Sequence, residues 1–162
     1  MADVPTFQPS LFYRDPMAAL RWLEAAFGFE TTSLVTDASG RVVHSEMSFL
    51  GGAVNINPEF SGEIIGEARM VSPLEVEGRG TQFIRVRLPD GLDAHFARAK
   101  AAGARITQEP GDQFYGERTY RALDPEGHVW NFAQTVAQPT LAEMERATGL
   151  TMATSLKETG HG

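Results

Sequence analysis

Residues 15–30, DPMAALRWLEAAFGFE, begin a stretch of sequence that is repeated once later in the chain. At an offset of 75 residues, Asp15, Ala19, Ala26 and Gly28 fall on Asp90, Ala94, Ala101 and Gly103. At an offset of 76 residues, Gly40, Gly51 and Asn55 fall on Gly116, Gly127 and Asn131. Two copies are too few for a solenoid. The repeat therefore predicts a pair of similar modules that pack together and place like positions around a shared cleft.

The first copy carries the start and stop signals of a helix. Asp15 can cap the helix, Pro16 suits its first position, and Gly28 supplies a left-handed stop. The apolar positions form one stripe: Ala19, Leu20, Leu23, Ala26 and Phe27. Segments of strand-like composition lie around the helix, at residues 7–14, 31–36, 41–49 and 53–57. The first module is therefore predicted to be β-α-β-β-β.

The second copy predicts the same order of elements. Strands are expected at residues 82–88, 105–108, 117–123 and 129–134, with a helix at 92–102. Thr140 and Glu143 form a capping box that begins a further short helix. We therefore predict an α+β fold in which two tandem modules form a curved mixed sheet around a cleft. The expected organisation is one domain over residues 1–137, with module one at about 5–57, a linker or lid at 58–80 and module two at 81–135, followed by a C-terminal helix at 138–156 and a flexible tail at 157–162.

Composition excludes several classes of protein. The 162 residues include no cysteine, which excludes disulfides, thiolate metal sites and cysteine nucleophiles. A net charge of −7 argues against a nucleic-acid partner. The first residues lack the basic and apolar regions of a signal peptide, and no apolar run approaches the roughly 18 residues that a membrane span requires. We expect a cytoplasmic protein with no membrane partner.

Three longer segments carry a resemblance to a known family: LFYRDPMAALRWLEAAFGFE (residues 11–30), GLDAHFARAKAAGARI (91–106) and YGERTYRALDPEGHVWNFAQ (115–134). With the two predicted modules, they resemble the vicinal oxygen chelate superfamily, which includes glyoxalase I, extradiol dioxygenases and bleomycin-resistance proteins. The likeness covers about residues 5–135 and is strongest to the small glyoxalase and bleomycin-resistance-like branch. The resemblance implies a curved sheet around a ligand cavity, helices on its convex side, and a homodimer.

The resemblance also implies where metal-dependent members hold their ion: on the first and last strand of each module, typically through His or Gln and through Glu. Counted from the helix caps and from the glycine turns, these positions are Gln8, Phe83, Asn55 and Asn131. A catalytic divalent ion needs about three protein ligands with charge or imidazole basicity. Three neutral amides and a phenyl ring do not supply them. We therefore predict no metal and no other cofactor.

The same amides suit a neutral polar or peptide-like ligand, because each offers two donors and an acceptor oxygen. Strand alternation places Asn55, Asn131, Phe83 and Arg85 on the face opposite the helices, where Arg85 either holds an anion or remains solvated. Tyr115 lies where a loop enters a strand, so its ring could stack on a ligand. The predicted ligand-binding residues are Gln8, Phe12, Asn55, Phe83, Arg85, Tyr115, Arg118, Tyr120 and Asn131.

His44 and Glu46 are the candidates for catalysis. They lie two residues apart on one predicted strand and therefore on one face, which suits a general acid/base pair or half of a metal site. A solvated polar face explains them equally well.

Three functions remain open from the sequence. The first is a metal-free protein that sequesters an aromatic or peptide-like small molecule. The second is a lyase, isomerase or dioxygenase of the same superfamily, with a displaced metal or with acid/base catalysis. The third is a scaffold that uses the fold without a small ligand. The absence of the expected metal ligands favours the first.

Overall fold

The computed structural model describes residues 4–61 and 68–155 and shows the predicted order of elements twice. Module one comprises β1 (Ser10–Tyr13), α1 (Pro16–Phe27), β2 (Glu30–Thr36), β3 (Val42–Phe49) and β4 (Gly52–Pro58). Module two comprises β7 (Ile84–Leu88), α2 (Leu92–Ala101), β8 (Arg105–Asp112), β9 (Glu117–Leu123) and β10 (Val129–Thr135). Between the modules lie β5 (Phe60–Ser61), β6 (Arg69–Met70) and the 3₁₀ helix η1 (Pro73–Val76), and after them lies α3 (Leu141–Thr148).

Each module forms its own four-stranded mixed sheet. The strand orders are β1-β4-β3-β2 and β7-β10-β9-β8. In both sheets the first strand runs parallel to the last, and the remaining pairs are antiparallel. The predicted α+β class and the tandem modules are therefore confirmed. Among the described residues no strand pair links the two sheets, so side chains must join the modules.

α1 forms where the sequence predicts it because both of its ends are capped. Asp15 Oδ1 accepts a hydrogen bond from Ala18 N at 2.9 Å, and Pro16 occupies the first turn. Gly28 ends the helix with a φ of 76°, a conformation that a residue with a Cβ atom rarely adopts. The helix buries the predicted stripe together with its first residue: Pro16, Ala19, Leu20, Leu23, Ala26 and Phe27.

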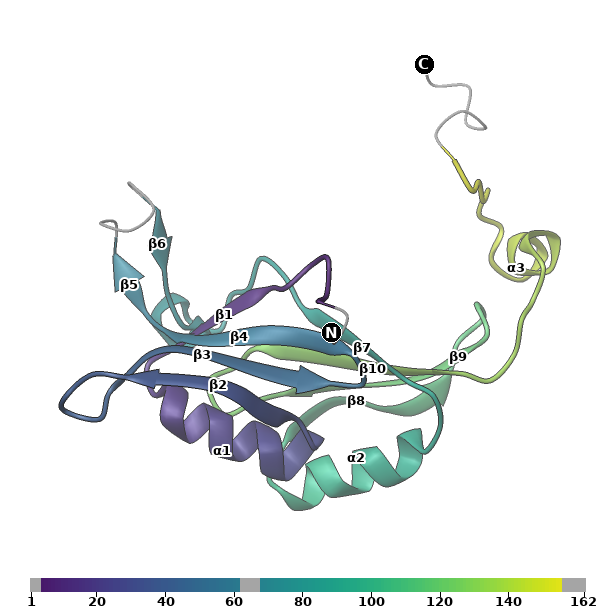
Figure 1. Ribbon diagram of the computed structural model, residues 1–162. Helices are drawn as coiled ribbons and strands as arrows, with labels where there is room; N and C mark the ends of the chain where they lie inside the picture. Colours follow the sequence, from purple (N-terminus) through teal and green to yellow (C-terminus); the bar gives the residue numbers. More distant parts are fainter. Residues whose placement is uncertain (1–3, 62–67, 156–162) are drawn as a thin grey trace.

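α1 and α2 lie next to each other on one side of the two sheets (Figure 1). Trp22 Nε1 donates a hydrogen bond to Ala102 O at 2.9 Å. The Arg98 guanidinium donates to the carbonyl oxygens of Glu24 and Ala25, in each case at 2.8 Å. These bonds join the C-terminal half of α1 to α2 and to the residue that follows it.

Aromatic rings fill that core across the boundary between the modules. The Phe27 ring of module one lies 5.5 Å from the Trp130 ring and 4.7 Å from the Phe132 ring of module two. His95 of α2 lies against the same rings, with Nδ1 2.6 Å from Tyr120 Oη and Nε2 3.0 Å from Phe27 O. Burial lowers the pKa of His95 below its usual 6.5, which favours the neutral ring at pH 7.

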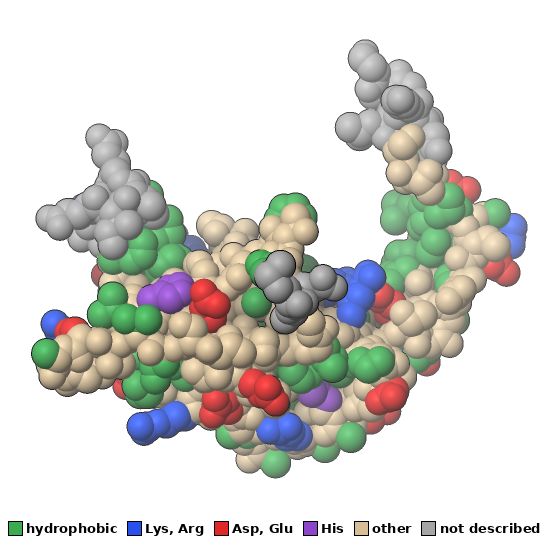
Figure 2. All heavy atoms as spheres, in the orientation of Figure 1, with side chains coloured by type: hydrophobic (Ala, Val, Ile, Leu, Met, Phe, Trp, Pro, Cys, Tyr) green, Lys and Arg blue, Asp and Glu red, His purple; other side chains and the backbone are tan. Residues whose placement is uncertain are grey.

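The side of the sheets opposite α1 and α2 is open. The β5–β6 hairpin and α3 both extend on this side, and the surface between them is hollowed (Figures 1 and 2). The segment that leads into α3 is fixed by Gly116 O, which accepts hydrogen bonds from Val136 N at 2.9 Å and Ala137 N at 3.0 Å. α3 buries none of its own residues, and Leu141 is 41% exposed. None of the described helices has the length and apolar character needed to cross a membrane.

Several bounds differ from the prediction. β7 begins at Ile84 instead of residue 82, so Phe83 precedes the strand, and α3 spans only Leu141–Thr148 of the predicted 138–156. β1 and β8 differ further. β1 begins at Ser10 instead of residue 7, and Phe7 is 87% exposed. Pro9 contributes only its carbonyl, which accepts from Asn55 N at 2.9 Å. β8 continues past Gln108 to Asp112 through a proline, which is tolerated because β8 is an edge strand. The predicted tail at 157–162 and part of the predicted linker or lid, residues 62–67, lie outside the described residues.

A buried carboxylate in the turn after β9 joins the two modules. Asp124 is only 5% exposed. Its Oδ1 accepts hydrogen bonds from the three backbone N–H groups that follow Pro125, at 2.9 to 3.1 Å. Its Oδ2 accepts from Tyr13 Oη at 2.6 Å and from Trp130 Nε1 at 3.1 Å. One side chain therefore ties the turn, the last strand of module two and the first strand of module one together.

The rest of the same turn bonds to the backbone of module one. The Glu126 carboxylate accepts from Arg14 N at 2.8 Å and from Asp15 N at 2.9 Å. His128 Nε2 donates to Phe12 O at 2.8 Å. The sequence Asp124 to His128 thus holds the junction between β1 and α1 in place.

We predict that Asp124→Ala lowers the free energy of unfolding by about 3 kcal/mol or more, because it leaves two buried donors without an acceptor at about 1–3 kcal/mol each. Tyr13→Phe, which removes one of those donors, should cost about 1.5 kcal/mol. Urea unfolding followed by Trp fluorescence measures both values. Equal losses in the two variants would show that Asp124 does not act as a shared acceptor.

Candidate functional site

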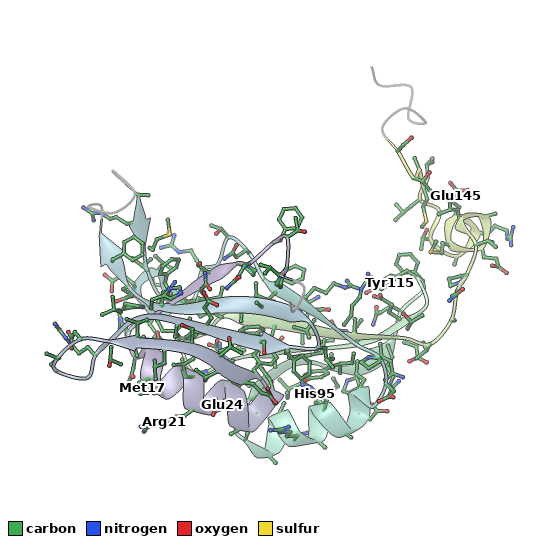
Figure 3. All side chains as sticks on the ribbon, in the orientation of Figure 1. Met17, Arg21, Glu24, His95, Tyr115 and Glu145 are labelled. Carbon is green, nitrogen blue, oxygen red and sulfur yellow. The ribbon has the colours of Figure 1, made fainter. Side chains whose placement is uncertain are left out.

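The two faces of each sheet are chemically distinct. Ile84, Val86, Trp130 and Phe132 belong to or pack against the core below the sheets, so their neighbours in the strands point to the opposite, helix-free face. Figure 3 shows the same division: His95 lies between α2 and the sheets, whereas Tyr115 lies on the helix-free side. The predicted binding residues can therefore be assigned to a face one by one.

On the helix-free face of module one, the predicted amides bond to each other. Asn55 Oδ1 accepts from Gln8 Nε2 at 2.6 Å, and Asn55 Nδ2 donates to Ser10 Oγ at 3.0 Å. Glu46 lies opposite Asn55 in the strand register. The structure thus brings Gln8 and Asn55 together, and each has its partner within the module.

Asn131 holds the repeat-related position in module two, and its surroundings differ. It is only 4% exposed, and its Oδ1 has no hydrogen-bond partner among the described residues. In the strand register Asn131 lies opposite Arg85 on β7 and opposite Arg121 on β9. A buried acceptor without a partner costs about 1–3 kcal/mol, so this oxygen is suited to receive a donor from a ligand.

Both arginines that flank Asn131 lie over aromatic rings. The Arg85 guanidinium is 5.8 Å from the centre of the Tyr115 ring, and that of Arg121 is 6.0 Å from the centre of the Phe83 ring. Three predicted residues, Phe83, Arg85 and Tyr115, are therefore brought to one place. Tyr115 is 37% exposed and Phe83 is 54% exposed, so both rings can contact a ligand.

A buried acid contacts Arg85 and Arg87, the two arginines of β7. Glu117 is 8% exposed, and its carboxylate contacts Arg85 Nη2 through Oε2 and lies 3.4 Å from Arg87 Nη2 through Oε1. The Arg85 contact lacks the alignment of a hydrogen bond. Glu117 therefore contacts the guanidinium groups of both Arg85 and Arg87, and its single negative charge offsets only one of their two charges.

A cleft between the modules reaches Arg85 and Arg87 of β7. It has a volume of about 380 Å³, within the usual range for small-molecule sites. Module one contributes Phe7, Pro9 and the turn between β3 and β4, and module two contributes β7 with Arg85 and Arg87. Arg85 and Arg87 thus border a space that both modules line, whereas Asn131, Phe83, Tyr115 and Arg121 lie outside its lining.

His44 and Glu46 do form a pair, as their spacing predicts. His44 Nε2 lies 3.2 Å from Glu46 Oε1, and both side chains are 40% exposed. His44 lines a second, larger cleft of about 690 Å³ at the other end of module one, together with Arg14, Arg41 and Asn57. The pair is therefore accessible to a ligand, but it lies apart from the lining of the cleft between the modules.

Three predicted binding residues have other partners. Tyr120 is completely buried in the core, where its hydroxyl contacts His95, so its ring lies on the helix side of the sheet. Arg118 donates to Asp93 and Asp112 at 3.1 and 2.9 Å. The Phe12 ring packs against Phe60 at 5.3 Å in an edge-to-face contact.

The donor set does not fit a catalytic metal at the positions that the resemblance implies. Gln8 and Asn55 already bond to each other, Phe83 has no lone pair, and Asn131 is neutral. Within residues 4–61 and 68–155, no group of three or more His, Asp or Glu side chains could hold an ion. At these positions the helix-free face therefore offers amides and a ring, which are not ligands of a catalytic metal.

Sequence reasoning missed Arg121 and Glu117. Arg121 follows the fully buried Tyr120, so strict alternation along β9 places it on the helix-free face. The sequence gives this signal only if Tyr120 is placed in the core, whereas Tyr120 is predicted to bind the ligand. Nothing in the sequence indicates that Glu117 is buried, because charged residues are rarely buried without partners and the partners come from β7.

Comparison with known proteins identifies relatives of the whole fold. Residues 6–132 match the family model described as the Glyoxalase/Bleomycin resistance protein/Dioxygenase superfamily. An uncharacterised protein of Mycobacterium tuberculosis is 27% identical over 143 residues, which cover 88% of this chain and 82% of that protein.

Solved structures agree with this assignment. TioX from Micromonospora sp. ML1 is 30% identical and superimposes with a TM-score of 0.63, covering 82% of this chain and all of TioX. The fosfomycin resistance protein FosX from Listeria monocytogenes, solved with Mn(II) and sulfate, is 14% identical with a TM-score of 0.55 over 88% of this chain and 96% of FosX. The FosX likeness shows the fold alone.

We predict that the two repeat-related amides respond oppositely to replacement by leucine. Asn131→Leu should leave the free energy of unfolding unchanged or raise it by up to about 1 kcal/mol, because it removes a buried acceptor without a partner. Asn55→Leu should lower it by about 1–2 kcal/mol, because it breaks the bonds to Gln8 and Ser10. Urea denaturation of the two variants compares them directly, and a larger loss for Asn131→Leu would show that Asn131 is a structural residue.

Proposed function

The chain belongs to the Glyoxalase/Bleomycin resistance protein/Dioxygenase superfamily, and we propose that it is a small-molecule-binding protein within it. The proposed ligand is an aromatic or peptide-like compound, bound without a metal ion. The proposed site lies on the helix-free face of module two, with Asn131 at its centre and Arg85, Phe83 and Tyr115 around it.

The single observation that carries this proposal is the buried Oδ1 of Asn131 without a partner. Native proteins satisfy nearly all buried polar atoms, and exceptions often mark sites of function. A ligand N–H or O–H group that bonds to this oxygen would offset the cost of burying it. The exposed rings of Phe83 and Tyr115 supply the apolar contact that small-molecule sites usually provide.

The absence of a metal from the proposal follows from donor chemistry. A resident divalent ion needs anionic or imidazole ligands, and the positions implied by the family carry amides and a phenyl ring. The folded state also has its own cross-module core around Phe27 and Asp124, so it needs no ion to join the modules.

A second candidate function is acid/base catalysis by His44 and Glu46. The observation in its favour is the 3.2 Å contact between the two side chains at the edge of the larger cleft. In that case His44 would act as the proton-transfer group and Glu46 would orient its ring. The two candidates use different modules, so single substitutions separate them.

For the binding function, we predict that Asn131→Leu weakens binding of N-phenyl-1-naphthylamine, a neutral aromatic probe with one N–H donor, by about tenfold, or 1.4 kcal/mol. His44→Ala, which alters the other module, should change the affinity less than about twofold. Fluorescence titration measures both variants.

The purified protein should contain substoichiometric Zn, Ni, Mn and Fe, and chelation should leave its melting temperature unchanged. A stoichiometric metal whose removal lowers the melting temperature, or equal effects of the two substitutions, would contradict the proposal.

We also propose that two copies of the chain form a symmetric homodimer. The support is the resemblance, together with two exposed apolar side chains: Leu141 of α3, which is 41% exposed, and Leu150 just after α3, which is 61% exposed. Light scattering at micromolar concentrations should report twice the mass of one chain. Leu141→Glu combined with Leu150→Glu should shift the equilibrium toward the monomer. Unsubstituted protein that is monomeric at all micromolar concentrations would contradict the proposal.

A further inference from the structure

We propose that the ligand of module two is an aromatic acid, a compound that combines an aromatic ring, an oxyanion and a separate N–H or O–H donor. This inference rests on the proposed binding function and names the chemical class of the ligand. It follows from three features of the helix-free face that converge on Asn131: charge, ring stacking and an unused acceptor.

Three of the four strands of the sheet of module two carry an excess of positive charge. β7, β9 and β10 contain four arginines and one acid: Arg85, Arg87, Arg118, Arg121 and Glu117. Arg118 forms ion pairs with Asp93 and Asp112, so its charge is already compensated. Glu117 offsets one of the remaining three, so two positive charges on this face have no compensating acid on the same strands. An anionic ligand group would supply the missing charge.

Arg121 is the residue best placed to donate hydrogen bonds to an anion. It is exposed, and it forms no ion pair within the described part of the chain. Its guanidinium is held over the Phe83 ring at 6.0 Å, just as Arg85 is held over Tyr115 at 5.8 Å. Stacking leaves the edge of a guanidinium free, and that edge presents paired N–H groups that match the two oxygens of a carboxylate or sulfonate.

The acceptor adds a requirement that a simple anion cannot meet. Asn131 Oδ1 lies between the two arginine strands in register, yet neither guanidinium bonds to it. A deprotonated oxyanion has no proton to donate. The ligand must therefore carry a separate N–H or O–H group close to its anionic group, on or beside the ring that stacks against Phe83 or Tyr115.

The overall charge of the protein makes this preference specific to the site. At −7 the chain repels anions at a distance, so an exposed positive patch is not a general property of its surface. Any preference for an anionic over a neutral ligand must arise from the local arginines. It should disappear when those arginines are replaced and persist when distant arginines are replaced.

Two probes with one skeleton test the proposal. 8-Anilino-1-naphthalenesulfonate carries the ring system, an N–H donor and a sulfonate, whereas N-phenyl-1-naphthylamine lacks only the sulfonate. We expect the sulfonate to bind the native protein at least about tenfold more tightly than the neutral amine, as measured by fluorescence titration; one decade corresponds to about 1.4 kcal/mol. Arg121→Gln should remove most of this difference while leaving the affinity for the neutral amine within about twofold.

Two matched variants complete the experiment. Arg21→Gln makes the same change in charge on α1, where the side chain points away from the sheets (Figure 3), and it should preserve the preference for the sulfonate. Asn131→Leu should weaken both probes by similar factors, because both donate one N–H group. Since Arg121 has no acidic partner to strand, Arg121→Gln should keep the native melting temperature, which a thermal scan verifies for every variant.

The outcomes separate this inference from the function on which it rests. Equal affinities for the two probes, with both weakened by Asn131→Leu, would overturn the aromatic acid and leave the binding site standing. Failure of both probes to bind would overturn both ideas. A sulfonate preference that survives Arg121→Gln, or that Arg21→Gln abolishes, would place the anion elsewhere and also overturn the inference.

Discussion

The buried carboxylate of Asp124 is the constraint from which the arrangement of this protein follows. No strand pair joins the two sheets among the described residues, so their relative position depends on side chains. Asp124 provides one acceptor for the turn of module two and another for Tyr13 of module one. Glu126 then accepts hydrogen bonds from the backbone between β1 and α1, and His128 donates to Phe12 O in β1. A charge at this depth is stable only because every lone pair has a donor, which makes the junction strict in geometry.

The junction determines which sides of the sheets are available for binding. With the start of α1 held against module two, the ring of Phe27 at its other end reaches Trp130 and Phe132, and the two helices share one side of the molecule. The helix side is thereby filled with rings and with His95, whose neutral form is favoured by burial. The opposite side is left without a covering layer, and polar side chains there can differ between the modules without disturbing the core.

Local signals in the sequence are sufficient for the elements but not for their partners. The caps at Asp15 and Gly28 predict both ends of α1, and β9 spans the predicted residues 117–123. Tyr120 is predicted to bind the ligand, but it is buried in the core beside its antiparallel neighbour Phe132. The sequence of one strand does not reveal which of its two faces points inward. The bond from Tyr13 to Asp124 spans 111 residues, and no periodicity reports a contact of that separation.

The two asparagines show how a repeat can separate structural from functional roles. Asn55 and Asn131 occupy equivalent places on the last strands of the modules, and the sequence treats them alike. In module one, Ser10 of β1 and Gln8, which precedes that strand, offer a hydroxyl and an amide, so Asn55 forms hydrogen bonds with both. In module two the equivalent neighbours are arginines held over aromatic rings, which cannot also satisfy the carbonyl between them. The same side chain is therefore structural in one module and left open in the other, and the difference arises entirely from the residues on the adjacent strands.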